Sequence, residues 1–359
     1  VGINAMEPAL FGIADGSIIM SWTEPDGTGF AVKTATFQGG NWSRPVTITT
    51  SNSLFVNWAD FPTVAAFNDG TLAVSWLQEN TNIPYAYDIN IALSSDAGQT
   101  WGSPIVPHDD QSTRQHGFLT LLPTERDEMI AVWLDAREYN SQSPGDSFGN
   151  AVQLRSTTIG KDGTLGKDIP LDLRACSCCQ TSAAITEDGT VLIAYRDRTA
   201  DEIRDISIVR RHNGIWSGPV NVHADGWEIS GCPVNGPAID AQATDAVVAW
   251  FTGADNIATI KVAFSEDSGV TFGPAFQVDS GESVGRVGTL MLATGDALIS
   301  WVEWTSDGEV LMLCRATKND GCVARQTITE HAASGSFNFP KLARSGDTIY
   351  LAWTQPIDS

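Results

Sequence analysis

Seven copies of one hairpin pattern run along the chain, and this repeat constrains the fold more than any other feature. Each copy has a short apolar segment, a turn that often contains Asp-Gly, and a second apolar segment that ends in an aromatic residue. The copies occupy residues 9–22, 63–76, 119–133, 182–195, 237–250, 289–301 and 340–353. Their closing aromatics follow one another at intervals of 54, 57, 62, 55, 51 and 52 residues. Self-similarity at this period is typical of propellers and solenoids.

The repeat reads as four strands. Asp-Gly between two apolar runs predicts a hairpin, because glycine tolerates positive φ, and the runs are too short and too β-branched for buried helices. Two more strand-like segments follow the first aromatic, at 30–37 and 45–50, and two follow the second, at 88–95 and 103–108. Four strands per repeat form a propeller blade. We therefore predict one all-β domain over residues 1–359, a β-propeller of four-stranded antiparallel blades. Seven blades are expected, with six as the alternative, and the last blade is incomplete or completed by an N-terminal strand.

Composition limits the classes of partner. Hydrophobic residues make up 42% and charged residues 18%, which is the composition of a folded chain. The net charge of −22 repels nucleic acid and anionic membrane surfaces and favours cations. No apolar run approaches the length of a membrane span, so none is expected. Six cysteines, an even number, permit disulfides and favour a secreted or periplasmic location.

Two segments resemble a known family motif. Residues 94–101 read SSDAGQTW and residues 265–272 read SEDSGVTF. Both resemble the Asp-box, S-x-D-x-G-x-T-W, of the sialidase (BNR-repeat) superfamily. The Asp can accept hydrogen bonds from turn N–H groups, the Gly supplies the special backbone conformation, and the aromatic packs between sheets. The resemblance implies a propeller, with the boxes away from the active site.

The same resemblance sets a test for sialidase activity. Family members use an arginine triad, whose first member normally lies in an R-I-P motif on the first inner strand, with a Tyr/Glu nucleophile pair and an Asp acid. Here that strand reads Met6-Glu7-Pro8-Ala9-Leu10, and the first arginine is Arg44. Exo-sialidase activity is therefore not expected. Residues 195–206 and 231–237 also look like bacterial exported sialidase-like proteins, which usually carry a Cys-x-Cys-Cys motif. This resemblance implies no particular activity.

The sequence predicts a metal site at the inner strands. The positions 17 or 18 residues before the closing aromatics of the third, fourth and fifth copies are His116, Cys178 and Cys232. Inner strands of a propeller crowd around one axis, so these side chains are expected to converge. Thiolates with imidazole suit copper or zinc. The predicted ligands are His116, Cys176, Cys178, Cys179 and Cys232, with copper favoured, zinc as the alternative, and no organic cofactor evident.

Two other states of the cysteines stay open. Cys232 can form a disulfide with Cys176, Cys178 or Cys179, or the thiols can form a redox-active pair. Cys314 and Cys322 flank a turn at residues 318–321, and a cross-strand disulfide is predicted there.

Polar residues also recur at the ends of the predicted second strands, which return to the face where the inner strands begin. The residues two positions after each aromatic are Glu24, Gln78, Asp135, Asp197, Thr252, Glu303 and Gln355. We predict that they form a mostly acidic rim, which would concentrate cations. The residues predicted to add to this binding rim are Arg137, Arg196, Arg198, Arg204, Arg286 and Asn235.

Three functions follow as hypotheses. The first is an exported propeller that binds a thiophilic metal for metal handling or redox chemistry. The second is a glycoside hydrolase or lyase whose acid and base come from Glu24, Asp135, Asp197 and Glu303. The third is a non-catalytic scaffold for glycans or proteins, with Trp58, Trp227 and Trp304 as platforms. The expected partner is a metal ion or a small molecule.

Overall fold

A computed structural model describes residues 1–2, 4–81, 83–139, 151–331 and 337–355. Over this part the chain is all-β, with strands β1 to β27, one short 3-10 turn (η1, Ala254–Asn256) and no α-helix. No helix in the described residues is long and apolar enough to cross a membrane. The chain divides into two compact units. The first comprises residues 1–173 with 341–352, and the second comprises residues 174–340 with 353–359.

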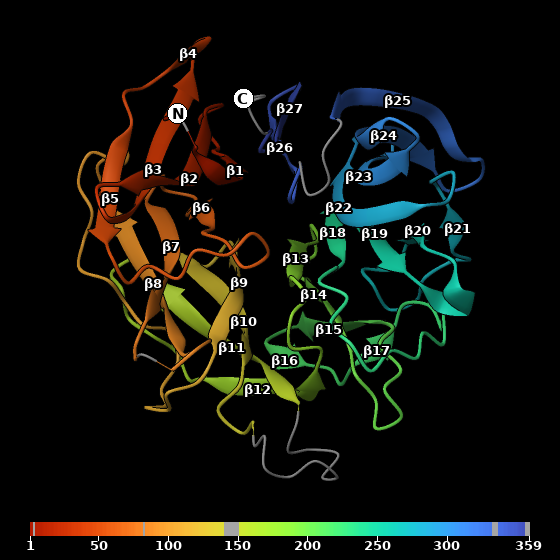
Figure 1. The fold of residues 1–359 in the computed structure, drawn as a ribbon, viewed down its shortest axis with the longest axis horizontal. Helices are drawn as coiled ribbons and strands as arrows, with labels where there is room; N and C mark the ends of the chain where they lie inside the picture. The colour runs from red at the N-terminus through yellow and green to blue at the C-terminus, as the bar shows by residue number, and fades with distance from the viewer. Residues whose placement is uncertain (3, 82, 140–150, 332–336, 356–359) are drawn as a thin grey trace. The chain divides into compact units, whose positions relative to one another are not determined.

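The first unit contains four antiparallel sheets, which Figure 1 colours from red to yellow-green, with the last two strands in dark blue. The first sheet consists of β1 (Met6–Gly12), β2 (Ile18–Asp26), β3 (Gly29–Gln38), β4 (Asn41–Trp42) and β5 (Val46–Ser51). The second consists of β6 (Val64–Ala66), β7 (Leu72–Glu79) and β8 (Tyr87–Ser94). The third consists of β9 (His116–Pro123), β10 (Glu128–Asp135), β11 (Val152–Gly160) and β12 (Ile169–Ala175). The fourth is the pair β26 (Lys341–Ser345) and β27 (Thr348–Ala352).

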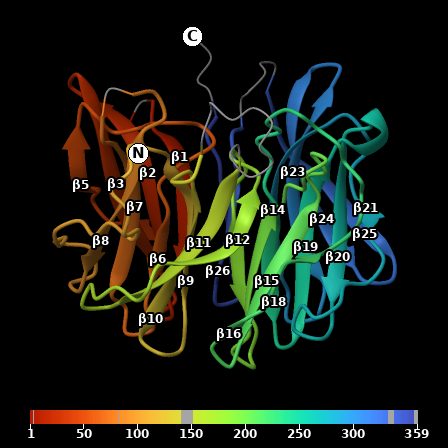
Figure 2. The same ribbon diagram turned by 90° about the horizontal axis from the view of Figure 1, so that it is seen from below.

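The second unit contains three sheets, seen from the side in green to blue in Figure 2. The first consists of β13 (Ser182–Ile185), β14 (Val191–Arg196), β15 (Ile206–His212), β16 (Ile215–Trp216) and β17 (Val220–Asn221). The next consists of β18 (Ala238–Gln242), β19 (Asp245–Thr252), β20 (Thr259–Ser265) and β21 (Phe276–Gln277). The last consists of β22 (Ser283–Met291), β23 (Ala297–Thr305), β24 (Gly308–Thr317) and β25 (Gly321–His331). Within each unit, the first strands of consecutive sheets contact one another.

The predicted strands are largely confirmed. Each of the seven hairpins is an antiparallel strand pair in a sheet of its own, and the segments at 30–37, 45–50 and 88–95 are strands. The segment at 103–108 is shorter than predicted, because it pairs only at Ile105, which exchanges backbone hydrogen bonds of 2.8 and 2.9 Å with Ile91. Closure of the sheets into one seven-bladed propeller stays a prediction.

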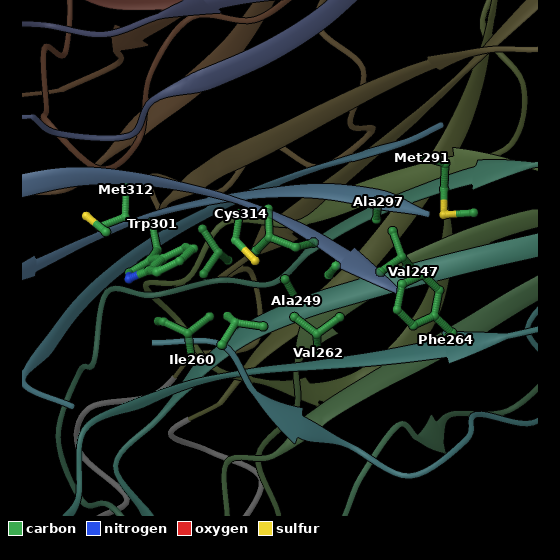
Figure 3. Packing of buried hydrophobic residues seen from close by; sticks show 14 of the residues in the cluster. Val247, Ala249, Ile260, Val262, Phe264, Met291, Ala297, Trp301, Met312 and Cys314 are labelled. Carbon is green, nitrogen blue, oxygen red and sulfur yellow. The ribbon is translucent and has the colours of Figure 1, made fainter. Parts of the chain in front are cut away.

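The closing aromatics form the core between sheets. Trp22, Trp133, Tyr195, Trp250 and Trp301 are all almost fully buried. Figure 3 shows the Trp301 indole among apolar side chains of β19, β20 and β24, in a cluster of buried residues. A buried Trp contributes a large apolar area, but its indole N–H still requires an acceptor. The need for this acceptor explains why an acidic residue follows several of the closing aromatics by two positions.

In three copies the indole N–H donates to a carboxylate two residues later in the chain. Trp22 donates to Glu24, Trp133 to Asp135 and Trp301 to Glu303, each at 2.8 Å. Residues i and i+2 of a strand lie on the same face, so the contact follows from the strand itself. Burial of the tryptophan therefore also fixes the position of the carboxylate.

The two Asp-boxes have matching hydrogen bonds. In the first, Thr100 donates to Asp96 through its backbone N–H at 2.8 Å and its hydroxyl at 2.6 Å, and Gly98 N donates to Ser94 Oγ at 2.9 Å. In the second, the corresponding distances are 2.9, 2.6 and 2.9 Å. The box glycines have φ of 82° and 73°, which L side chains rarely adopt. The boxes are thus structural turns, as their residues predict.

Candidate functional site

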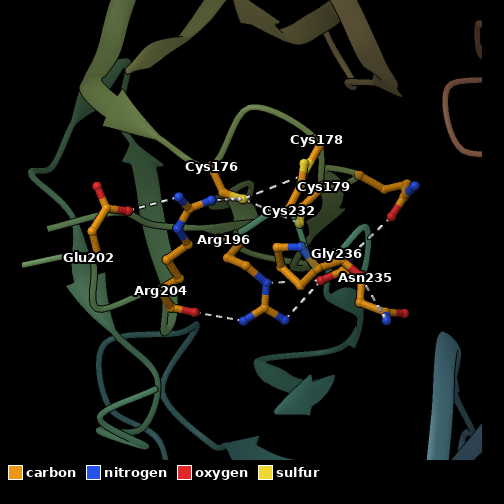
Figure 4. Close-up of a disulfide and its surroundings, with 11 residues drawn as sticks. Cys176, Cys178, Cys179, Arg196, Glu202, Arg204, Cys232, Asn235 and Gly236 are labelled. Carbon is orange, nitrogen blue, oxygen red and sulfur yellow. Dashed lines mark hydrogen bonds and ion pairs between the residues drawn. A yellow bond between two sulfur atoms is a disulfide. The ribbon is translucent and has the colours of Figure 1, made fainter. Parts of the chain in front are cut away.

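Four cysteines of the second unit lie together, and we call them the sulfur centre: Cys176, Cys178, Cys179 and Cys232 (Figure 4). Cys178 and Cys232 form a disulfide. Cys176 and Cys179 are free thiols, and both are buried. The sulfur atom of Cys176 lies 3.5 Å from that of Cys179 and 3.8 Å from that of Cys178. The segment between β12 and β13, together with Cys232 from the segment between β17 and β18, therefore places a reduced pair directly beside an oxidised pair.

Backbone contacts position the sulfur centre. Cys176 N donates a 3.0 Å hydrogen bond to the carbonyl of Arg196, which fixes the Cys-rich segment against the end of β14. The Cys232 loop is held by Gly236, whose N–H donates to Gln180 Oε1 at 3.0 Å. A Cβ at Gly236 would lie 2.0 Å from the carbonyl oxygen of Gln180, so only glycine permits this approach. The two segments are thereby brought within disulfide distance.

A buried arginine sets the charge of the free pair. Arg204 Nη1 donates a 3.3 Å hydrogen bond to the sulfur of Cys176, and its Nη2 donates to Glu202 at 2.8 Å (Figure 4). The hydrogen bond from Cys179, followed by the charges of Arg204 and Arg196, lowers the pKa of Cys176 to about 6 although burial opposes the change. Burial and the neighbouring thiolate raise the pKa of Cys179 well above its ordinary value. At neutral pH the pair is therefore one thiolate and one thiol.

The predicted binding rim is corrected by the structure, because most of its side chains are buried and bind neighbouring groups of the protein. Arg196 is 2% exposed and donates to the carbonyls of Arg204 at 2.6 Å, Phe251 at 2.7 Å, and Asn235 at 2.8 and 3.0 Å. Its guanidinium also lies 4.9 Å from the ring centroid of Trp227. Strand ends leave carbonyls without ladder partners, and a guanidinium with five donors satisfies several of them.

The remaining rim residues have similar roles. Asn235 is buried, donates to the carbonyl of Val284 at 3.0 Å and accepts from the backbone N–H of Arg286 at 2.8 Å. Arg286 is itself buried, and Arg198 pairs with Glu202 at 2.6 Å. These side chains hold the loops around the sulfur centre and β22 in place.

The predicted acid and base carboxylates are also engaged. Asp135 is fully buried and accepts from Trp133 and Arg137, and Glu303 is buried against Trp301. Glu24 is partly exposed but accepts from Trp22 and from Lys33 at 2.5 Å. Asp197 accepts from the Ser207 hydroxyl at 2.9 Å. Asp135 and Glu303 cannot form part of an exposed rim, because the aromatic that precedes each of them draws it into the core.

His116, the remaining predicted metal ligand, belongs to the first unit, whereas the cysteines belong to the second. It is fully buried, and its ring is stacked on that of His108 with centroids 3.7 Å apart. Burial opposes protonation, but the carboxylates of Asp88, Asp135 and Asp110 raise the pKa of His116. Sequence reasoning missed His108, because it lies in the irregular segment between β8 and β9, outside the repeat.

Two further carboxyls of the first unit were also missed. Burial, with a smaller contribution from Asp60, raises the pKa of Glu7 to about 8, and burial raises the pKa of Asp60 to about 7. Asp60 accepts from the Tyr87 hydroxyl at 2.8 Å and from Phe118 N at 2.7 Å. Glu7 has φ of 59°, a strained conformation for this residue type. Its signal in the sequence was a charged residue on the first predicted inner strand.

The other predicted features have mixed outcomes. The disulfide between Cys314 and Cys322 is confirmed and joins β24 to β25. Trp58 and Trp304 are exposed, as platforms for a ligand would be. Trp227 is buried beneath the Arg196 guanidinium and is corrected from a platform to a core residue.

No protein-family model matches the chain, and no curated protein matches its sequence. Solved structures match its fold. A protein of unknown function from Dyadobacter fermentans is 15% identical, with 98% of this chain and 91% of that chain covered and a TM-score of 0.52. A Penicillium chrysogenum α-L-arabinanase complexed with arabinobiose is 12% identical, with 92% and 94% covered and a TM-score of 0.52.

A polysaccharide lyase of family PL25, an ulvan lyase bound to a GlcA-Rha3S unit, is 12% identical, with 91% of this chain and 79% of that chain covered and a TM-score of 0.50. At these identities the likeness concerns the fold alone. The chain therefore shares with these proteins an all-β architecture of antiparallel sheets, which is consistent with a β-propeller.

Proposed function

We propose that this chain is an exported protein that holds a thiophilic metal ion, with copper(I) favoured and zinc as the alternative, on the sulfur centre. One observation carries the proposal: a thiolate at Cys176 lies 3.5 and 3.8 Å from two other cysteine sulfurs. Sulfurs bound to one tetrahedral ion at about 2.3 Å are about 3.8 Å apart. The spacing of the three sulfurs therefore fits a shared metal ion.

The charge of the site also supports a soft cation. Cys176 is deprotonated near neutral pH, and thiolate sulfur is the form that binds metals. The Arg204 guanidinium offsets part of the negative charge that several thiolates would accumulate. Cys176, Cys178 and Cys179 would hold the ion, and Cys232 would be free to contribute after the disulfide opens.

Oxidation state would control the site. With the Cys178–Cys232 disulfide closed, only Cys176 and Cys179 offer thiols. Two equivalents of an external thiol reduce the disulfide to two cysteine thiols and become a disulfide themselves. Disulfides persist in oxidising compartments, so the two in this chain are consistent with a secreted or periplasmic location. Metal uptake would then follow reduction, which is a form of metal handling.

Copper(I) competition with a coloured chelator tests the proposal. Reduced protein should bind one copper(I) per chain, and oxidised protein should bind it at least about tenfold more weakly. Cys176→Ser and Cys178→Ser should each weaken copper(I) binding by at least about 10–100-fold, which is the effect of removing a hydrogen-bond partner of a metal ligand. The matched control is the double variant Cys314→Ser/Cys322→Ser, which also removes two sulfurs but should bind like the wild type. Equal binding by all variants, or none by the reduced wild type, would remove the proposal.

A second candidate function is carbohydrate cleavage, by hydrolysis or by elimination. It is favoured by Glu7 and Asp60, whose pKa values of about 8 and 7 leave a carboxyl protonated near neutral pH, as a general acid must be. The fold shared with an arabinanase and an ulvan lyase is compatible with it. Glu7 and Asp60 would replace the four carboxylates predicted from the sequence.

A screen of neutral and uronate-containing polysaccharides tests this candidate. Hydrolysis is followed by new reducing ends, and elimination by the ultraviolet absorbance of the unsaturated product. Activity should fall by at least about a hundredfold in Glu7→Gln, since a positioned acid contributes 10²–10⁴-fold. Asp201→Asn, a change to an exposed carboxyl, is the control and should keep full activity. Turnover that survives Glu7→Gln would exclude this residue as the acid.

A further inference from the structure

The first unit contains a second cluster of ligating side chains, separate from the sulfur centre. We propose that Asp88, His108 and His116 bind a divalent transition-metal ion, with zinc(II) as the best match. Ligating atoms of the three residues lie within 4.8 Å of one another. Asp88 lies near the start of β8, His116 begins β9, and His108 lies between these strands.

The two imidazoles are held by one carboxylate. Asp110 Oδ1 lies 3.1 Å from His108 Nδ1 and 2.9 Å from His116 Nε2, and both contacts are hydrogen bonds. A carboxylate only accepts, so these two nitrogens carry the protons. This arrangement fixes the tautomer, so the opposite nitrogen of each ring has a lone pair for an ion whenever the ring is neutral, and at His116 the ion would take the place of the proton that the surrounding carboxylates favour. Histidines that bind metals usually have such an outer carboxylate.

The two opposite nitrogens point at Asp88. His108 Nε2 lies 3.4 Å and His116 Nδ1 lies 3.1 Å from Asp88 Oδ1. Both nitrogens are buried, and neither is in hydrogen-bond geometry with any partner. A lone pair facing a carboxylate oxygen is repelled unless a cation or a proton lies between them. Two such nitrogens aimed at the same oxygen mark a position that suits a metal ion.

The distances fit a tetrahedral ion. Ligands bound at about 2.0–2.1 Å, as nitrogen and oxygen bind zinc, are about 3.3 Å apart. The observed nitrogen–oxygen separations of 3.1 and 3.4 Å lie on either side of this value. Two imidazoles and one carboxylate are a common set for zinc and leave its fourth position open.

The charges around the cluster favour binding of the cation next to Asp88 rather than next to Asp110. On the opposite side, Arg137 Nη2 lies 3.5 Å from Asp110, 2.8 Å from Asp135 and 2.7 Å from Asp168, so a guanidinium already supplies the positive charge there. Asp88 accepts a neutral hydrogen bond from Asn80 at 3.0 Å. Its side chain is 26% exposed, whereas those of His108 and His116 are 3% and 0% exposed, so an ion would enter past Asp88.

Titration of the metal-free protein in its disulfide-bonded form with cobalt(II) tests this site, followed by displacement with zinc(II). We expect one cobalt(II) per chain with the d–d absorption of nitrogen and oxygen ligands and without the charge-transfer band of a cobalt–thiolate bond. The spectrum thereby separates this site from the sulfur centre, whose variant Cys176→Ser should leave the signal unchanged. Failure of the copper(I) proposal would not affect this result.

Variants decide which residues bind. Asp88→Asn should weaken cobalt(II) binding by at least about 10–100-fold, and His108→Gln by a similar factor. Asp88 is partly exposed, so Asp88→Asn should stay folded, as circular dichroism can verify, even if His108→Gln does not. His223→Gln, which alters a partly exposed histidine elsewhere, is the matched control and should bind normally. Wild-type affinity in Asp88→Asn, a thiolate band alone, or no stoichiometric cobalt(II) would overturn the proposal.

Discussion

Replacing Arg204 with methionine should move the titration of the Cys176 thiol from a pKa of about 6 toward the ordinary value of 9.0. Methionine keeps the apolar stem but removes the hydrogen bond to sulfur and the positive charge. At pH 7 the thiolate fraction should fall from about nine tenths, and the part of the pKa depression that remains is due to the hydrogen bond from Cys179 and the charge of Arg196. The ultraviolet absorbance of thiolate, followed against pH, measures the midpoint directly. The affinity for copper(I) should decrease along with this shift.

The same substitution changes how stability depends on pH. In the wild type, the folded-state pKa of Cys176 is depressed below its ordinary value of 9.0, so the unfolded chain binds more protons between pH 6 and 9. The contribution of this thiol to stability is therefore complete above pH 9 and is lost as the pH falls through 6. Arg204→Met should flatten this dependence, and Arg204→Lys, which keeps the charge, should restore part of it. An unchanged midpoint in Arg204→Met would show that Cys179 and Arg196 alone stabilise the thiolate.

The largest expected loss of stability is that of Arg196→Met. The wild-type guanidinium is buried and donates to three backbone carbonyls, which methionine would leave without these donors. Hydrogen bonds to charged groups contribute about 1.5–3 kcal/mol each, and the contact with Trp227 adds to them. We expect a decrease of at least about 3 kcal/mol in the free energy of unfolding, measured by urea denaturation.

Arg44→Met is the control for this experiment. Arg44 is exposed, so its loss should change the free energy of unfolding by no more than about 0.5 kcal/mol. A similarly small effect of Arg196→Met would mean that water replaces the guanidinium at the three carbonyls. In that case Arg196 would be available for ligand binding, as the sequence-based rim hypothesis assumed.

The features that the sequence predicted well are the local ones. The hairpins, the buried aromatics and the Asp-boxes each depend on residues within one repeat, where strand periodicity and turn chemistry determine the outcome. The Cys314–Cys322 disulfide is also local, because it spans one hairpin turn. These features required no knowledge of how distant segments meet.

The site was predicted less well, because its chemistry depends on contacts between distant segments. Spacing placed Cys178 and Cys232 together, but it could not show that they would form a bond while Cys176 and Cys179 remain free. Polar residues at strand ends were expected on an exposed rim. Arg196 is instead buried because backbone carbonyls need its N–H donors, and Asp135 is buried because the Trp133 indole needs an acceptor. His108 follows no repeat, so only the folded chain reveals its stacking on His116.

The matching hydrogen bonds of the two Asp-boxes have a consequence for folding. Each box closes on itself within eight residues, so the loop entropy lost in forming it is small compared with that of pairing distant strands. Such turns can form early and bring the strands on either side into proximity before the surrounding sheets are complete. The chain thereby gains two short-range initiation points, one in each compact unit.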